Sequence, residues 1–295
     1  MKNTKISWAH HTFNPIRGCT KVSAGCTNCY ADELSKRNPK TLGIWGDNGT
    51  RVLASESMWR EPEKWNREAE ESGKPVRVFC ASLADVFEDW QGPISDNQGR
   101  VLWMSPSMQF RPEGTGCPTH LPGWRKATYH DVRARLFELI DRTPFLNWLL
   151  LTKRPENIKR MITCRNDTDC DGYCPVCFRD ASFCRSRPNV WLGTTVENQE
   201  QADKRIPDLL KCRDLSPVLF LSCEPLLGPV DFRKVPGMNR TDRSGVVDWV
   251  IVGGESGRNA RPMHPKWARS LLNQCQSANV PFFFKSFSKI TRCRG

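Results

Sequence analysis

Three cysteines near the start of the chain have the spacing of a metal site. They form the pattern Cys19-x6-Cys26-x2-Cys29, so one short loop carries three thiols. Three thiolates are one ligand fewer than a closed zinc or iron–sulfur site takes. A metal ion or cluster held only here would keep one coordination position open to an exchangeable ligand. An open position of this kind indicates chemistry rather than a purely structural site.

Two other interpretations of this loop remain open. Cysteines are often small buried apolar residues with no further role. A distant fourth ligand, for which His10, His11 and Cys80 are candidates, would close a structural zinc site. The number of ligands favours metal binding of some kind. It favours an open iron–sulfur cluster over a closed structural zinc site.

A second group of cysteines lies between Met161 and Pro188. Its pattern is Cys164-x5-Cys170-x3-Cys174-x2-Cys177-x6-Cys184, in a segment with few apolar residues to form a core. Four thiolates would close a zinc knuckle or hold an auxiliary iron–sulfur cluster, and the half-site Cys174-Pro175-Val176-Cys177 slightly favours zinc. The predicted ligands are Cys170, Cys174, Cys177 and Cys184, with Cys164 as the spare. The cysteine pattern therefore predicts that residues 161–188 form a metal-binding insertion.

The elements that position these groups follow an alternating pattern. Short apolar runs recur, each followed by a loop and a helical pattern, as in parallel strands joined by helices. The predicted strands are Val76–Cys80, Asn147–Leu151, Val190–Gly193, Val218–Ser222, Trp249–Gly253 and Pro281–Lys285, with Ile6–Trp8 as a seventh. The predicted helices are Ala31–Arg37, Asp131–Asp141, Asn198–Leu210 and Pro265–Ala278, and Pro155 begins another.

The fold class predicted from this pattern is α/β, a partial (β/α) barrel of six or seven parallel strands in one domain, 1–295. Continuous apolar runs such as Trp148–Leu151 are typical of strands buried on both faces. Residues 90–124 break the pattern, because they are rich in Gly, Pro, Ser and Trp without clear periodicity. This segment is interpreted as an irregular excursion that forms a lid.

Polar residues follow nearly every predicted strand. They are Ser82 and Asp85, Thr152–Arg154, Thr194 to Asn198, Cys223 and Glu224, and Gly253–Ser256. The carboxyl ends of parallel strands meet at one face, so these residues predict a ligand-binding rim. Thr195 and Asn198 have an alternative interpretation as caps of the following helix. The turn Gly253-Gly254-Glu255-Ser256-Gly257 matches neither the dinucleotide nor the phosphate-loop fingerprint.

Composition restricts the partners. The 295 residues carry a formal net charge of +12, which favours anionic partners such as nucleic acid or phosphorylated small molecules, although a solvated basic surface is the alternative. The first residues of the sequence lead into no apolar signal-peptide core, so a reducing cytoplasmic location is expected. In that compartment the 14 cysteines are expected as thiols rather than disulfides. No run of 18 apolar residues occurs, which excludes a membrane span on length.

Taken together, these motifs resemble a phage-associated three-cysteine family of unknown function, which looks like a divergent branch of the radical S-adenosylmethionine enzymes. The similarity runs from about Lys5 to Lys285. It rests on the cysteine loop up to Tyr30 and on Leu150–Pro155, Asn189–Gly193, Val196–Gln199, Ser222–Pro229 and Trp249–Gly257.

The resemblance implies that Cys19, Cys26 and Cys29 hold a [4Fe–4S] cluster whose fourth iron S-adenosylmethionine chelates. The first cysteine gap is six residues here, where most radical S-adenosylmethionine enzymes have three, and Asn28 rather than an aromatic residue precedes Cys29. Candidates for cofactor binding, by position, are Ser82, Asp85, Thr195, Glu197, Gly253, Gly254 and Glu255. Glu224 and Lys153 are the candidate catalytic residues.

The function expected from the sequence is therefore reductive cleavage of S-adenosylmethionine to modify an anionic substrate, with a nucleotide or nucleic acid as the candidate class. A low-potential electron donor would be the redox partner. The alternative is a non-catalytic, zinc-stabilised nucleic-acid-binding protein in which both cysteine groups are structural.

Overall fold

The computed structural model describes residues 1–114, 122–162, 186–238, 246–257 and 259–288. The predicted ligands Cys170, Cys174, Cys177 and Cys184 lie outside the described residues, as does Cys164, so the second metal group stays a prediction.

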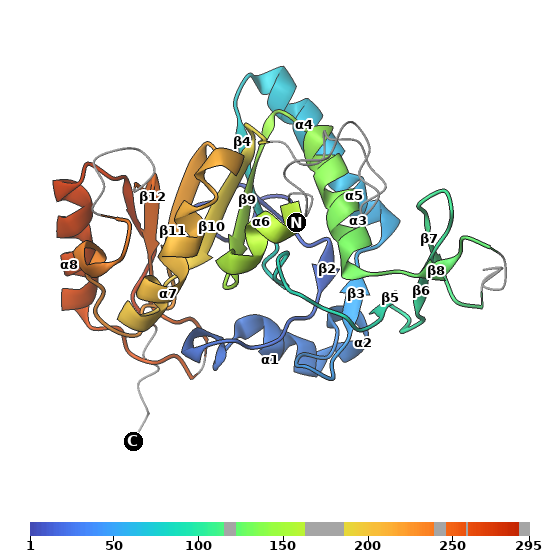
Figure 1. The fold of residues 1–295 in the computed structure, drawn as a ribbon, viewed down its shortest axis with the longest axis horizontal. Coiled ribbons are helices and arrows are strands. Elements are labelled where there is room, and N and C mark those ends of the chain that lie inside the picture. The colour runs from blue at the N-terminus through green and yellow to red at the C-terminus, as the bar shows by residue number, and fades with distance from the viewer. Residues whose placement is uncertain (115–121, 163–185, 239–245, 258, 289–295) are drawn as a thin grey trace.

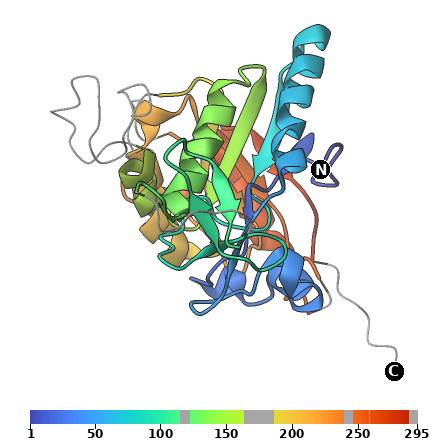
Figure 2. The same ribbon diagram turned by 90° about the vertical axis from the view of Figure 1, so that its right-hand side faces the viewer.

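Seven parallel strands form the central sheet and confirm the predicted fold class. Their order is β1 (His11–Phe13), β4 (Val76–Cys80), β9 (Leu146–Thr152), β10 (Val190–Thr195), β11 (Val218–Cys223), β12 (Trp249–Val252) and β13 (Phe282–Phe284). Every neighbouring pair is parallel. The sheet curls into a half-barrel with helices on its outer side (Figures 1 and 2).

The strands are recognisable in the sequence because they are buried on both faces. Leu149, Leu150 and Leu219 are all fully buried, as parallel strands covered on two sides require. The prediction of a strand at Ile6–Trp8 is wrong, because the first strand is β1, directly after this segment. Ile6 and Trp8 are apolar because they pack against the inner face of the sheet.

The outer helices include the predicted ones and several that the sequence did not indicate. The α-helices are α1 (Tyr30–Arg37), α2 (Pro39–Leu42), α3 (Glu56–Trp59), α4 (Glu61–Ser72), α5 (Tyr129–Asp141), α6 (Ile158–Ile162), α7 (Gln199–Leu210) and α8 (Pro265–Ser277). Short 3-10 helices span Ala24–Cys26, Pro155–Asn157, Arg213–Leu215 and Phe232–Lys234.

Asn198 caps α7 by accepting a hydrogen bond from Gln201 N at 3.0 Å, as one interpretation predicted, whereas Thr195 lies in β10. None of the helices in the described ranges has the length and apolar character that a membrane crossing requires.

Two small sheets lie beside the half-barrel. One contains β2 (Ile16–Arg17), β3 (Arg51–Leu53) and β5 (Ile94–Ser95), and the other contains β6 (Leu102–Met104), β7 (Phe110–Pro112) and β8 (Arg125–Lys126). The segment 90–124 is thus less irregular than predicted, since it includes β5, β6 and β7. The β6–β8 sheet projects from the right side of the molecule in Figure 1. None of its described residues lines the cavity discussed below, and its role as a lid stays a prediction.

Candidate functional site

A cavity of about 660 Å³ lies at the carboxyl ends of the sheet strands. This volume is within the range of small-molecule and cofactor sites. Its wall contains all three cysteines of the loop, Cys19, Cys26 and Cys29. It also contains six of the nine candidate cofactor-binding and catalytic residues, namely Ser82, Asp85, Lys153, Thr195, Glu224 and Glu255. Residues from six separate parts of the chain therefore converge on one space.

The three cysteines have different surroundings. Cys19 is buried, whereas Cys26 and Cys29 are partly exposed, and all three are free thiols. Burial raises the pKa of the Cys19 thiol to about 12, and the carboxylates of Glu88 and Asp85 act in the same direction. Cys29 is the N-cap residue of α1.

All three thiols line the cavity, but they do not surround one common metal position. Among the residues that the structure describes, no three His, Cys, Asp or Glu side chains are close enough together to hold one ion. Loading a metal or cluster therefore requires side-chain rotation, which partly exposed residues undergo readily. Cys26 and Cys29 are the two partly exposed thiols of the three.

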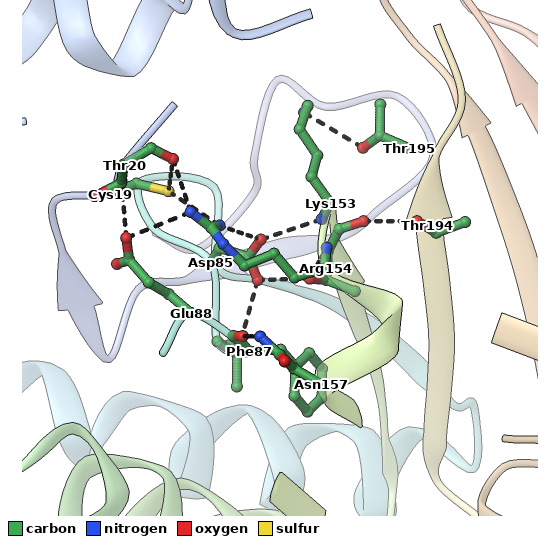
Figure 3. Close-up of polar contacts among 12 residues, drawn as sticks. Cys19, Thr20, Asp85, Phe87, Glu88, Lys153, Arg154, Asn157, Thr194 and Thr195 are labelled. Carbon is green, nitrogen blue, oxygen red and sulfur yellow. Dashed lines mark hydrogen bonds and ion pairs between the residues drawn. The ribbon is translucent and has the colours of Figure 1, made fainter. Parts of the chain in front are cut away.

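A buried ion-pair network fixes the first half of the loop to the sheet (Figure 3). Arg154, just beyond β9, donates to Asp85 Oδ2 at 2.9 Å, to the Thr20 carbonyl at 2.8 Å and to Cys19 Sγ at 3.8 Å. Glu88 accepts from Thr20 N at 2.8 Å and from Arg51, which is fully buried, through Nε at 2.6 Å and Nη2 at 2.7 Å. Asp85 itself also accepts from Thr152 Oγ1 and Lys153 N, so its carboxylate is saturated.

A second buried carboxylate fixes the middle of the loop. Glu197 is fully buried beyond β10 and does not line the cavity. It pairs with Arg205 at 2.7 Å, and it accepts from the Ser23 hydroxyl and from Gly25 N. A Cβ at Gly25 would lie 2.9 Å from the Glu197 carboxylate, so glycine is required for this close approach.

Glu255 holds the last part of the loop from the β12 side. Its Oε2 accepts from Asn28 Nδ2 at 2.9 Å and from Arg261 N at 2.8 Å, and Arg261 Nη2 bonds Oε1 at 2.5 Å. The same guanidinium donates to the Ala24 carbonyl at 2.8 Å. Burial opposes ionisation of Glu255, but the hydrogen bonds from Arg261 and Asn28 prevail and lower its pKa.

Lys153 and Glu224 differ from these carboxylates in having unused hydrogen-bonding capacity. Lys153 Nζ lies 3.4 Å from Thr195 Oγ1, and no carboxylate in the described part of the chain pairs with it. Glu224 pairs with Lys285 through Oε1, and in the same ranges its Oε2 has no partner. Both side chains line the cavity, so each can bind a ligand there.

The remaining predicted cofactor residues lie nearby. Ser82 exchanges hydrogen bonds with Asn14 at 3.2–3.3 Å, and its carbonyl accepts from Tyr30 OH at 2.8 Å. Gly253 and Gly254 do not line the cavity. A Cβ at Gly254 would lie 2.2 Å from Ser288 N, so this glycine allows β12 to approach the segment after β13.

The candidates for a distant fourth cysteine-loop ligand lie elsewhere. His10 accepts from Arg77 N through Nδ1, and His11 stacks on Trp65 with 4.5 Å between ring centroids. Cys80 is fully buried in the main core. None of these three candidates lines the cavity, which counts against a closed zinc site made with one of them.

The side chains in the cavity wall suit a soft metal centre, such as an iron–sulfur cluster, better than a hard cation that prefers carboxylate ligands. The three thiols are the soft ligands in the wall, and the carboxylates Asp85 and Glu255 already accept several hydrogen bonds. Two indole N–H groups in the same wall, Trp8 Nε1 and Trp45 Nε1, are buried without a partner among the described residues. Trp59, Trp65 and Trp103 have buried indole N–H groups, likewise unpaired within the described ranges, away from this wall, so these donors alone do not indicate a ligand.

The residues that hold the loop were mostly missed by sequence reasoning. Arg51, Glu88, Arg205 and Arg261 come from four separate segments, and no local pattern connects them to the cysteines. Arg154 had a signal, since it follows the predicted strand Asn147–Leu151 in the motif Thr152-Lys153-Arg154-Pro155.

Comparison with known proteins gives a family but no characterised relative. No curated protein and no solved structure matches this chain significantly. The model of a family described as "Protein of unknown function (DUF5131)" matches residues 3–110 and 121–294. The match covers nearly the whole sequence, and the chain therefore belongs to this family.

Proposed function

We propose that this protein is a radical S-adenosylmethionine-like enzyme that acts on an anionic substrate in the cytoplasm. The observation that carries the proposal is the convergence of Cys19, Cys26 and Cys29 on the cavity that also receives Lys153 and Glu224. Three thiols and binding groups in one cavity of cofactor size favour a catalytic site over a structural zinc site. The relationship to radical S-adenosylmethionine enzymes, the phage association and the nucleotide or nucleic-acid substrate class remain parts of this proposal.

The three cysteines would hold a [4Fe–4S] cluster, leaving one iron for S-adenosylmethionine. When bound, the cluster would supply the low-potential electron that cleaves S-adenosylmethionine to methionine and a 5′-deoxyadenosyl radical. The free thiols of the described cysteines are compatible with the reducing compartment that such a cluster needs.

The chain's own residues would bind and orient the ligands. Glu224 is the better placed of the two rim carboxylates to accept a hydrogen bond from the cofactor amine or ribose, because one of its oxygens is unused among the described contacts. Glu255 remains a cofactor-binding candidate, although the Arg261 and Asn28 donors occupy it. Lys153 would pair with a phosphate or carboxylate of the substrate, in agreement with the net charge of +12.

Anaerobic reconstitution tests this function and separates it from the zinc alternative. We expect the protein to become brown, to bind about four irons at the first site and to cleave S-adenosylmethionine under reduction. Each of Cys19→Ala, Cys26→Ala and Cys29→Ala should lose this iron while keeping the circular dichroism of the folded barrel. Cys80→Ala, which removes a buried thiol outside the cavity, is the control and should keep the iron. A colourless protein with tightly bound zinc at these cysteines would contradict the proposal.

A further inference from the structure

We infer that Arg154 is a positioning residue for the cluster: it donates a hydrogen bond to the sulfur of Cys19 and raises the reduction potential of a cluster held there. The inference rests on the proposed function, because it concerns a cluster bound by this loop. It assigns to one side chain a task that the cysteine pattern does not indicate.

The first argument is the position of the guanidinium. Arg154 Nη1 lies 3.8 Å from Cys19 Sγ and 2.9 Å from Asp85 Oδ2, and Nη2 bonds the Thr20 carbonyl at 2.8 Å (Figure 3). The side chain is therefore fixed on two sides next to the sulfur. A donor held in place before a ligand binds loses little entropy when the bond forms.

The second argument is that Cys19 alone has such a neighbour. It is the buried cysteine of the three, and no other guanidinium–thiol contact is found among the described parts of the loop. Asn28 and Tyr30, which flank Cys29, direct their side chains to Glu255 and to the Ser82 carbonyl instead. Within the described residues, Cys19 is therefore the ligand candidate whose sulfur itself has a guanidinium donor.

The sign of the effect follows from charge. Reduction adds one electron to the cluster, so a cation and an N–H donor at a ligating sulfur stabilise the reduced form and raise the potential. Removing Arg154 would also leave Asp85 without its cation, and Glu88, 3.5 Å from Nη2, would lose a contact as well. The uncompensated carboxylate of Asp85 acts in the same direction as the lost hydrogen bond, whereas Glu88 keeps its ion pair with Arg51.

The test is the midpoint potential of the reconstituted protein, measured by a titration that electron paramagnetic resonance follows. Arg154→Met should change the ratio of oxidised to reduced cluster at a fixed potential by about tenfold, a decrease of about 59 mV for a one-electron couple. Arg154→Lys, which keeps the charge, should give a smaller decrease. The matched control is Arg133→Gln, since buried Arg133 donates to the Val86 and Glu88 carbonyls and to no sulfur. It should weaken folding without moving the potential.

A measurement on the unaltered protein decides the matter where the Arg154 variants fail to fold or to hold iron. Protein labelled with ¹⁵N only at arginine should show a weak hyperfine coupling between the reduced cluster and a guanidinium nitrogen. Absence of that coupling, or an unchanged potential in loaded Arg154→Met, overturns the role of Arg154 while leaving the cluster itself established. Failure of the unaltered protein to bind iron at this loop overturns both proposals.

Discussion

Glu197 and Glu255 carry the same side chain and contact the same loop, yet their surroundings assign them different tasks. Glu197 is fully buried and pairs with buried Arg205, whereas Glu255 lines the cavity and pairs with Arg261, whose side chain is one-third exposed. Breaking a buried pair leaves an uncompensated charge in a medium that solvates it poorly. Glu255 is buried as well, but the exposed side of Arg261 lets solvent screen its pair, which therefore contributes less to stability.

The same substitution at both positions should therefore separate stability from ligand binding. We expect Glu197→Gln to lower the free energy of unfolding by about 3–5 kcal/mol, and Glu255→Gln to lower it by less, because Arg261 remains partly solvated when its partner is neutral. S-adenosylmethionine binding, measured by calorimetry on protein of equal iron content, should weaken only in Glu255→Gln. Equal stability losses in the two variants would contradict this assignment.

The limits of sequence reasoning are also clear at the residue scale. Cys19, Cys26, Cys29 and the rim residue Lys153 could be identified because ligand spacing and position after a strand are local signals. The partners of Glu197 and Glu255 could not be found in this way. Whether a rim carboxylate meets a ligand or an arginine depends on how helices and loops pack above the sheet, and a single sequence does not encode that packing locally.

At the scale of elements, the strands and helices that bury the most apolar residues are the ones that the sequence predicts. The central strands are continuous apolar runs because both of their faces are covered. Helix α4 was missed because only Pro62, Trp65 and Ala69 of its twelve residues are buried, which leaves a weak apolar stripe. The short strands β7 and β8 are missed for a similar reason, since none of their residues is buried. Strand β6 buries Leu102 and Met104, but three residues are too few to show a period.

Helix α5 has a capping box that makes its stability dependent on pH. Asp131 accepts from Thr128 N and from both terminal nitrogens of Arg125. Burial opposes ionisation, but these hydrogen bonds prevail and lower the pKa of Asp131 below its ordinary value of 3.8. The carboxylate therefore stabilises the fold above that value, and the stabilisation is lost as the pH falls through the lower pKa of the folded state.

We expect Asp131→Asn to lower the free energy of unfolding by about 1 kcal/mol at pH 7. The difference from the unaltered protein should begin to shrink as the pH falls below about 4, where Asp131 of the unfolded state takes up a proton. It should disappear only below the lower pKa of the folded state, where both side chains are neutral. Urea unfolding at several pH values measures it. The control is Glu71→Gln, which neutralises an exposed carboxylate of α4 and should have little effect at any pH. A difference that does not change with pH would exclude the charge as its cause.

At the scale of the whole molecule, the half-barrel needs a cover for its inner face, and the segment before β1 provides it. Trp8 is 4% exposed and packs on the sheet, with its ring centroid 4.6 Å from that of Phe79 and 6.3 Å from that of Trp249. Trp8 and Phe79 belong to an apolar cluster, separate from the main core, whose other buried members are Ala9, Leu149, Phe220 and Ile251. Because Trp8 also lines the cavity, the same side chain closes the core and forms part of the wall of the site.

Removal of this indole should therefore weaken the fold and the site together. Trp8→Ala should lower the free energy of unfolding by about 3–5 kcal/mol, the usual cost of deleting a buried aromatic ring. Trp8→Phe should recover part of that loss, since the ring still packs on Phe79. The control is Ile44→Ala, because Ile44 is 54% exposed and its change should stay within about 0.5 kcal/mol. Denaturant midpoints measure all three variants, and iron content after reconstitution should fall in the order of their stabilities. If Trp8→Ala unfolds at the denaturant concentration of the unaltered protein, the inner face does not depend on this cover.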